Sequence, residues 1–266
     1  MVRVAISGAA GRMGRALLAA VEKEPKTRLT AALVRPGSPL VGSKLAALGG
    51  MPPSDMVLVD NLAAVTEHFD VLVDFTAPAA TLENLDLCAA QGKAAVVGTT
   101  GFSATEQACL QDAAVQVPIV FAANFSTGIA LAQRLLEVAA PVMAEADIEI
   151  IEAHHRHKRD APSGTALTLG QTVAAALGRD LAECARYDRA GRATQRERDT
   201  IGFASLRAGD LVGEHTVLFA TAGERLEITH KASSRAAFTQ GALRAARWLA
   251  AGRPAGLYSM ADVLGI

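Results

Sequence analysis

The stretch from residue 148 to residue 167, IEIIEAHHRHKRDAPSGTAL, holds side chains well suited to catalysis. Six consecutive positions in it carry only histidine or basic residues: His154, His155, Arg156, His157, Lys158 and Arg159. Histidine titrates near neutral pH, so this loop suits proton transfer. Its positive charge also suits an anionic ligand. Because the net charge of the chain is -1 and aromatic residues make up only 4%, we expect a small anion and no nucleic acid.

A helix N-terminus is expected directly after the basic loop. Ser163 is a good N-cap residue, and the backbone N–H groups of Gly164 and Thr165 would point at an anion bound there. A carboxylate held by these amides would also meet Lys158. The combination favours a site for a mono- or dicarboxylate. The alternative is an ordinary solvated basic loop.

The histidines allow more than one interpretation. A metal site is one of them, but no fourth ligand follows at a recognisable spacing. Neighbouring residues on a strand also point to opposite faces, so His154 and His155 cannot easily share one ion. We therefore expect no metal. One of the two could be a structural histidine, and at least one is expected to act as an acid or a ligand contact.

A glycine turn near the N-terminus predicts a nucleotide site. Gly8, Gly11 and Gly14 lie in GAAGRMG, between an expected strand at 2–7 and an expected helix at 12–24. Such glycines let backbone approach a pyrophosphate, which the helix N-terminus attracts. The spacing departs from G-x-G-x-x-G, and a plain structural turn is the alternative.

The end of the second expected strand bears on which nucleotide is used. A fold that prefers NAD usually carries an acid there for the ribose hydroxyls, but this chain has Val34 followed by Arg35. Arginine can bind a 2′-phosphate with two hydrogen bonds. We predict use of NADPH, or at least no strong preference for NADH. The alternative is that Arg35 is a solvated loop residue.

Two further segments follow expected strands, GTTG at 98–101 and AANFS at 122–126. Ligands of open α/β sheets bind at the carboxyl ends of the strands, and small residues there would let a nicotinamide ring approach backbone. Ordinary loop chemistry is the alternative.

The order of elements predicts an α/β protein with two domains. Up to about residue 126, buried strands alternate with helices, which is typical of a Rossmann-type, doubly wound parallel sheet. From residue 127 the pattern becomes that of a second, α+β domain with a mixed or antiparallel sheet. Segments 200–209, 214–221 and 224–232 are predicted as antiparallel strands, and the polar segment 185–200 as a loop. A last helix, 236–252, is expected to return to the first sheet.

Cysteine usage and hydropathy bear on location. The three cysteines are scattered, which fits a reduced cytosolic protein. The N-terminus shows no apolar signal segment, and Arg134 and Glu137 interrupt the apolar region 128–144. We expect a cytoplasmic protein that does not interact with membranes.

Seven motifs in order resemble one family. They are GAAGRMG, VDFT, GTTGF, FAANFS, EAHHRHKRDAPSGTA, IGFASLRAGDLVGEHTV and ERLEITHKASSR. Together they resemble the bacterial dihydrodipicolinate reductases, the 4-hydroxy-tetrahydrodipicolinate reductases of lysine and diaminopimelate biosynthesis, over essentially the whole chain. The resemblance implies a cytoplasmic homotetramer that reduces a cyclic dicarboxylic imine with NADPH or NADH. It also implies a dinucleotide domain at 1–126 and 235–266, and a substrate and oligomerisation domain at 127–234.

The resemblance assigns roles to individual residues. It implies that His154 donates or accepts a proton, that Lys158 donates one, and that His155, Gly164 and Thr165 bind substrate carboxylates. The implied cofactor contacts are Gly8, Ala9, Ala10, Gly11, Arg12, Met13, Val34, Arg35, Gly98, Thr99, Thr100, Ala122, Ala123, Asn124 and Phe125. Members of the family often carry an acid where Val34 stands, so the ribose contact differs here.

Three other functions fit parts of the pattern. One is another two-domain NAD(P) oxidoreductase, such as an amino-acid dehydrogenase. Another is a regulatory protein that senses the nucleotide without turnover, although such a protein would not need the HHRHK loop. The third is a hydratase without net reduction.

Overall fold

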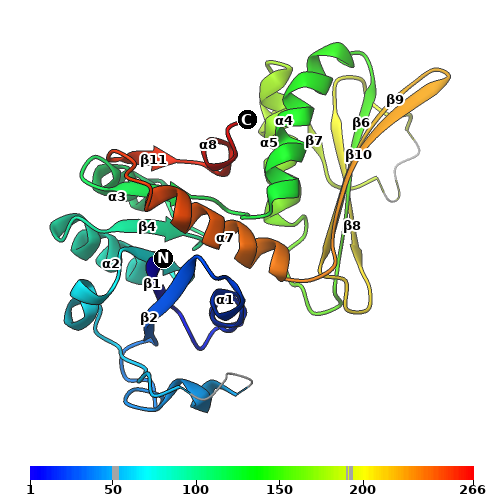
Figure 1. Ribbon diagram of the computed structural model, residues 1–266. Coiled ribbons are helices and arrows are strands. Elements are labelled where there is room, and N and C mark those ends of the chain that lie inside the picture. Colours follow the sequence, from blue (N-terminus) through cyan, green and yellow to red (C-terminus); the bar gives the residue numbers. More distant parts are fainter. Residues whose placement is uncertain (50–53, 190, 192–193) are drawn as a thin grey trace. The chain divides into compact units, whose positions relative to one another are not determined.

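The computed structural model describes residues 1–49, 54–189, 191 and 194–266. The chain divides into two compact units (Figure 1). Unit 1 comprises Met1–Thr127 and Arg235–Gly265, and unit 2 comprises Gly128–Ser234 together with the terminal Ile266. No helix among the described residues is both long and apolar enough to cross a membrane.

Unit 1 is built on a parallel sheet with the strand order β11-β5-β4-β3-β1-β2. The strands are β1 (Val2–Ser7), β2 (Thr27–Leu33), β3 (Val71–Asp74), β4 (Ala94–Val97), β5 (Pro118–Phe121) and β11 (Gly256–Tyr258). All residues of β3 and β4 are buried, as expected for central strands covered on both faces.

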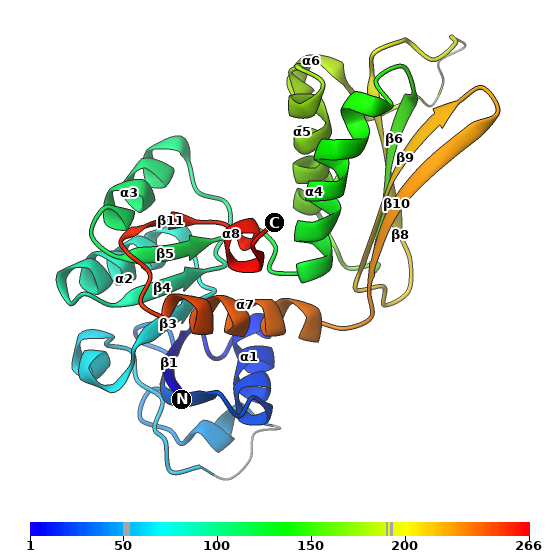
Figure 2. The ribbon, with the colours of Figure 1, turned by 45° about the horizontal axis from the view of Figure 1, so that its top comes forward.

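Helices cover both faces of this sheet (Figure 2). They are α1 (Arg12–Lys23), α2 (Pro78–Ala90), α3 (Ala104–Ala114), α7 (Ala236–Leu249) and α8 (Met260–Leu264), with short 3-10 helices at Leu45–Leu48 and Ala63–His68. On one face, Leu85 of α2 and Leu110 of α3 pack with Leu72 of β3. On the other, α7 lies against α1 and the central strands. The doubly wound fold expected from the sequence is confirmed, and the last helix returns to it as predicted.

Unit 2 packs helices against a mixed sheet with the strand order β10-β9-β6-β8-β7. The strands are β6 (Asp147–His154), β7 (Ala185–Arg186), β8 (Ile201–Arg207), β9 (Gly213–Thr221) and β10 (Glu224–Ala232), and the helices are α4 (Thr127–Val142), α5 (Gly164–Ala176) and α6 (Leu181–Cys184). Ile148 and Ile150 of β6 are fully buried and form one core with Leu169 and Val173 of α5.

One strand pairing in unit 2 differs from the sequence-based expectation. β9 and β10 form the expected antiparallel pair. However, β8 is parallel to β6, and β6 lies between it and β9. The alternation of apolar and polar residues along a strand shows which face is buried, but it does not show which strand pairs with which. The central strand of the three is β6, which has apolar residues on its buried face. The segment 185–200 also contains the short strand β7, and its residues 190, 192 and 193 lie outside the described part.

Candidate active site

In unit 1 the first turn after β1 requires glycine at two positions. Gly8 has φ +82°, and a Cβ there would lie 2.6 Å from the carbonyl oxygen of Phe75. A Cβ on Gly14 would lie 2.1 Å from the carbonyl oxygen of Gly8. No side chain larger than hydrogen fits either position, so the turn stays close to both α1 and the end of β3.

The N-terminus of α1 is arranged to receive negative charge. Its N-cap residue is Gly11, which makes no side-chain capping hydrogen bond, and its first turn contains no acidic residue. The first N–H groups of a helix lack partners inside the helix and carry partial positive charge. Arg12 and Met13 open this turn. The site therefore suits a phosphate or pyrophosphate.

A pocket of about 540 Å³ lies at the carboxyl ends of β1, β2 and β3. In the sheet, β1 lies between β2 and β3, so this is where the strand order reverses. Ligands of doubly wound folds bind at such a point. The lining residues are Ser7, Gly8, Ala10, Gly11, Leu33, Val34, Arg35, Pro36, Ser38, Asp60, Phe75, Thr76, Ala77, Ala80, Glu83 and Asn84.

Some predicted cofactor contacts line this pocket and others do not. Gly8, Ala10, Gly11, Val34 and Arg35 belong to its wall. The remaining predicted contacts lie in the same turn or after β4 and β5: Ala9, Arg12, Met13, Gly98, Thr99, Thr100, Ala122, Ala123, Asn124 and Phe125. The pocket thus joins the glycine turn to the end of β2, while the other predicted contacts lie outside its wall.

A buried carboxylate that the sequence analysis did not single out organises this sheet edge. Asp74, at the end of β3, is fully buried. It accepts hydrogen bonds from Thr76 (2.6 Å), Thr81 (3.1 Å), Thr99 (3.2 Å) and Asn84 (2.7 Å). These bonds hold the turns after β3 and β4 together. The sequence signal was an Asp ending an apolar run, VLVD, which needs polar partners once buried.

In unit 2, β6 ends in a buried pair of titratable side chains. Glu152 and His154 lie two residues apart on one strand and therefore share a face. His154 Nδ1 lies 2.6 Å from Glu152 Oε2. Arg207, at the end of β8, donates to both oxygens of Glu152 at 2.8 Å. The parallel pairing of the two strands places His154 directly beside Arg207.

The charges of this group fix the tautomer of His154. Burial alone would raise the pKa of Glu152, but hydrogen bonds from Arg207, Ser205 and His154 outweigh it and lower that pKa to about 2. An ionised carboxylate only accepts, so His154 Nδ1 carries the hydrogen and its Nε2 is left as the acceptor. Burial lowers the pKa of His154, although the bond to Glu152 works in the opposite direction. His154 is therefore mainly neutral at pH 7.

The same carboxylate reaches the start of α5. The N–H of Ser163 donates to Glu152 Oε1 at 3.1 Å, and the Ser163 hydroxyl caps the helix by accepting from Ala166 N–H. Gly164 and Thr165 begin this helix. His154 and Gly164, which lie ten positions apart in the sequence, are thereby connected through Glu152.

A further buried histidine, His215, contacts both Ser163 and His154. His215 Nε2 is 2.9 Å from the Ser163 hydroxyl, and the His215 ring meets that of His154 edge-on at 5.1 Å. Burial, together with repulsion from His154, lowers the pKa of His215 to about 4. His215 lies in the motif IGFASLRAGDLVGEHTV, but it was assigned no role, because it is far in sequence from the other histidines of the site.

Lys158 lies in the loop between β6 and α5. Its ammonium group forms an ion pair with Asp160 at 2.8 Å, and one fifth of its side chain is exposed. The pair lowers the pKa of Asp160, mainly through the hydrogen bond from Lys158. His155 is half-buried, and its Nδ1 has no hydrogen-bond partner among the described residues.

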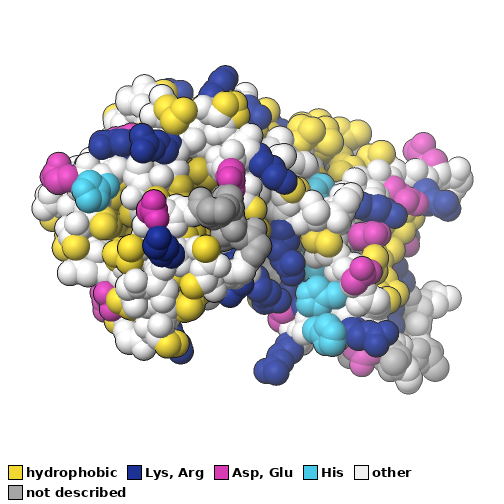
Figure 3. All heavy atoms as spheres, turned by 60° about the horizontal axis from the view of Figure 1, so that its bottom comes forward, with side chains coloured by type: hydrophobic (Ala, Val, Ile, Leu, Met, Phe, Trp, Pro, Cys, Tyr) yellow, Lys and Arg dark blue, Asp and Glu magenta, His cyan; other side chains and the backbone are white. Residues whose placement is uncertain are grey.

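The described residues contain no group of three or more His, Cys, Asp or Glu side chains that could hold a metal ion. Figure 3 shows histidine side chains beside both basic and acidic ones on one face of the molecule. Within the loop itself, Lys158 is paired with the carboxylate of Asp160.

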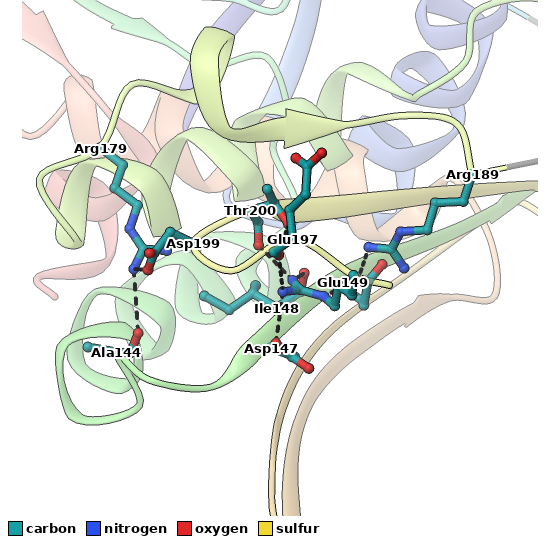
Figure 4. A network of polar contacts seen from close by, with 10 residues as sticks. Ala144, Asp147, Ile148, Glu149, Arg179, Arg189, Glu197, Asp199 and Thr200 are labelled. Carbon is teal, nitrogen blue, oxygen red and sulfur yellow. Dashed lines mark hydrogen bonds and ion pairs between the residues drawn. The ribbon is translucent and has the colours of Figure 1, made fainter. Parts of the chain in front are cut away.

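Other charged residues of unit 2 belong to a separate network at the start of β6 (Figure 4). Arg196 donates to Asp147 and Glu149 and to three backbone carbonyls, and Arg189 pairs with Glu149 at 2.5 Å. Arg179 pairs with Asp199. The bonds of Arg189 and Arg196 attach the segment after β7 to β6.

Comparison with known proteins gives matches along the whole chain. Residues 2–125 match the family model described as dihydrodipicolinate reductase, N-terminus, and residues 128–264 match dihydrodipicolinate reductase, C-terminus. The 4-hydroxy-tetrahydrodipicolinate reductases of Pseudomonas fluorescens strains Pf-5 and SBW25 are 58% and 56% identical, with both chains fully covered.

Solved structures agree with this result. A dipicolinate-bound dihydrodipicolinate reductase from Paenisporosarcina sp. TG-14 is 28% identical, with a TM-score of 0.76 and 98% of each chain covered. An amine dehydrogenase from Mycobacterium smegmatis has a TM-score of 0.60 at 14% identity, covering 97% of this chain and 95% of its own, and shares the fold alone.

Proposed function

The chain belongs to the dihydrodipicolinate reductase family, and from this premise we propose that it reduces 4-hydroxy-tetrahydrodipicolinate to tetrahydrodipicolinate with NAD(P)H. The observation that carries the proposal is 58% identity to a reductase of that name over the full length of both chains. The product would serve lysine and diaminopimelate biosynthesis.

The dinucleotide is assigned to unit 1. The glycine turn leaves room that a Cβ would fill, the N-terminus of α1 has no side-chain cap, and the pocket lies at the reversal of strand order. These features fit a pyrophosphate and an adenosine. When bound, the cofactor supplies the hydride. We propose NADPH as preferred, or both nucleotides as usable, because Arg35 lines the pocket and the end of β2 carries no acid.

The dicarboxylate substrate is assigned to unit 2. The proposed ligands of its carboxylates are His155 and the first residues of α5, Gly164 and Thr165. A helix N-terminus favours a carboxylate, and the cationic Lys158 belongs to the loop that leads to this helix. The relative from Paenisporosarcina is described as dipicolinate-bound, and dipicolinate is a planar dicarboxylate with the same ring atoms as the substrate.

We assign proton delivery to Lys158. Loss of the 4-hydroxyl as water gives a conjugated imine, and hydride addition would leave an enamine anion, with its charge shared by the ring nitrogen and the ring carbon that must take a proton. Because burial lowers the pKa of His154 and its Nδ1–H is held by Glu152, the neutral His154 has Nε2 as an acceptor. The ammonium of Lys158, held beside Asp160, can donate. His154 then binds or orients the ring through Nε2.

We also propose a separate role for each domain. Residues 1–126 and 235–266 would bind the dinucleotide, and residues 127–234 the substrate, with subunit contacts that form a homotetramer. We propose that the enzyme works in the cytoplasm, where the reduced nucleotides and its unstable substrate are made.

The test is a coupled assay. Dihydrodipicolinate synthase generates the substrate from pyruvate and aspartate semialdehyde, and the absorbance of NADPH or NADH is followed after addition of the protein. We expect nucleotide oxidation that depends on both the synthase and this protein. Nucleotide binding without oxidation would instead indicate a sensor, and loss of substrate without oxidation a hydratase.

A further inference from the structure

The end of β2 cannot bind ribose hydroxyls through a side chain at position 34. The Val34 side chain has no polar atoms, and the residue is 5% exposed. An acid at this place normally accepts hydrogen bonds from the adenosine ribose. The pocket nevertheless extends to this point, because Leu33, Val34 and Arg35 all belong to its wall.

A second segment runs beside β2 and ends at the same edge. Leu33 and Val59 form a parallel bridge. Val34 N–H donates to the carbonyl of Val59 at 2.9 Å, and Val59 N–H donates to that of Ala32 at 3.1 Å. Parallel neighbours lie about 5 Å apart. Asp60, which follows Val59, therefore leaves this segment next to Val34.

Asp60 lines the same pocket as the glycine turn and Arg35. It is half-buried, and within the described part of the chain its carboxylate takes part in no ion pair or side-chain hydrogen bond. Lys44, a basic residue of the adjoining loop, pairs with Asp55. The Asp60 carboxylate can therefore accept hydrogen bonds from a ligand.

We propose that Asp60 replaces the missing acid of β2 and binds the adenosine ribose hydroxyls, which makes it a determinant of cofactor specificity. The proposal rests on the proposed use of NAD(P)H. Asp60 and Arg35 act in opposite directions: the carboxylate favours a ribose with free hydroxyls and repels a 2′-phosphate, whereas the guanidinium attracts the phosphate. Their balance permits the use of both nucleotides.

The test is calorimetric titration of the purified protein with NADH and with NADPH. For Asp60→Asn we expect NADH affinity to fall about tenfold or more, since hydrogen bonds to a charged group are lost. NADPH affinity should stay unchanged or rise, because a repulsive charge has gone. The double variant Val34→Glu with Asp60→Asn should regain NADH affinity. The ratio of kcat/KM for the two nucleotides should change in the same direction.

Two acids serve as comparisons. Asp55→Asn removes an exposed acid outside the pocket and should change neither affinity. Glu83 also lines the pocket, but from α2. The proposal is overturned if Asp60→Asn binds NADH as the unaltered protein does, if it weakens both nucleotides equally, or if Glu83→Gln shows the selective loss instead. If the unaltered protein binds neither nucleotide, the proposed cofactor is itself wrong.

Discussion

At the scale of single residues, the candidate site of unit 2 depends on Glu152. Its carboxylate accepts from Arg207, from the Ser163 backbone and from His154. Burying a carboxylate is costly unless all its acceptor capacity is used, and here it is used by groups from three elements. Glu152 is thus a positioning residue that sets the tautomer of His154 and connects it to α5.

Replacing Glu152 by glutamine should therefore act through His154. Removing the negative charge removes the interactions that raise the pKa of His154, so that pKa should fall further below its ordinary value. Because a glutamine does not fix the tautomer and orientation of His154 as the carboxylate does, we also expect kcat to fall about 10- to 100-fold. NMR titration of the His154 ring measures the pKa directly.

Glu214→Gln is the matched control for that experiment. Glu214 lies on β9 and pairs with Lys231 at 3.3 Å. It should leave the pKa of His154 and kcat near those of the unaltered protein. An unchanged His154 pKa in Glu152→Gln would contradict the positioning role.

Lys158 tests the assignment of the proton donor. Lys158→Ala should lower kcat by about 10² to 10⁴ and weaken binding of dipicolinate, because proton and charge are both lost. Lys158→Arg keeps the charge, but a guanidinium does not release its proton near neutral pH. It should bind dipicolinate well and still fail in turnover. Turnover by Lys158→Arg at nearly the unaltered rate would assign proton delivery to another group.

Candidate functional residues could be predicted from the sequence where they lie close together along the chain. The loop at His154–Lys158 and the turn at Gly8–Gly14 are examples, and the structure places them at a strand end and a helix start. Glu152 and Arg207 are 55 positions apart. Their contact depends on the parallel pairing of β6 with β8, which hydrophobic alternation does not specify.

At the scale of elements, β9 brings a histidine to the buried end of α5. His215 has its pKa lowered to about 4 and stays neutral in the folded protein at pH 5. An unfolded chain binds a proton at this histidine below about pH 6.5. The unfolded state therefore binds more protons between about pH 6.5 and 4, and stability of unit 2 must fall as pH falls through that window.

His215→Gln should reduce this pH dependence. Glutamine keeps a polar partner for Ser163 but does not titrate. One of the contributions to the loss of stability between pH 6.5 and 4 therefore disappears. His154 and His230, whose pKa values burial also lowers, still contribute in the same direction. Hydrogen exchange of β9 and α5 amides at pH 7 and pH 5 measures the effect. Identical losses of protection in both proteins would show that His215 is not responsible.

Elements were predictable in proportion to their length and pattern. The long α5 and α7 carry clear start signals or apolar faces, and their predicted positions agree with the structure. β11 was not predicted, because Gly256–Tyr258 has only three residues and none of them is buried. Such a short strand is defined by its neighbour β5 rather than by its own sequence.

At the scale of the whole molecule, the chain combines a dinucleotide fold with a mixed-sheet unit that carries the titratable groups. Relatives with the same fold at about 14% identity include an amine dehydrogenase, so the fold alone does not determine the reaction. The full-length identity to reductases supports the reductase reaction, and we propose that the group around His154 and Lys158 selects it.

Transfer of deuterium tests the central claim most directly. The coupled reaction is run with NADPH deuterated at C4 of the nicotinamide on the transferred side, and the product is examined by mass spectrometry. Because net hydride transfer to the ring is the proposed reaction, the account predicts tetrahydrodipicolinate with one deuterium and an equal amount of NADP⁺ formed. A dehydrated product without deuterium, with the NADPH unconsumed, would contradict it.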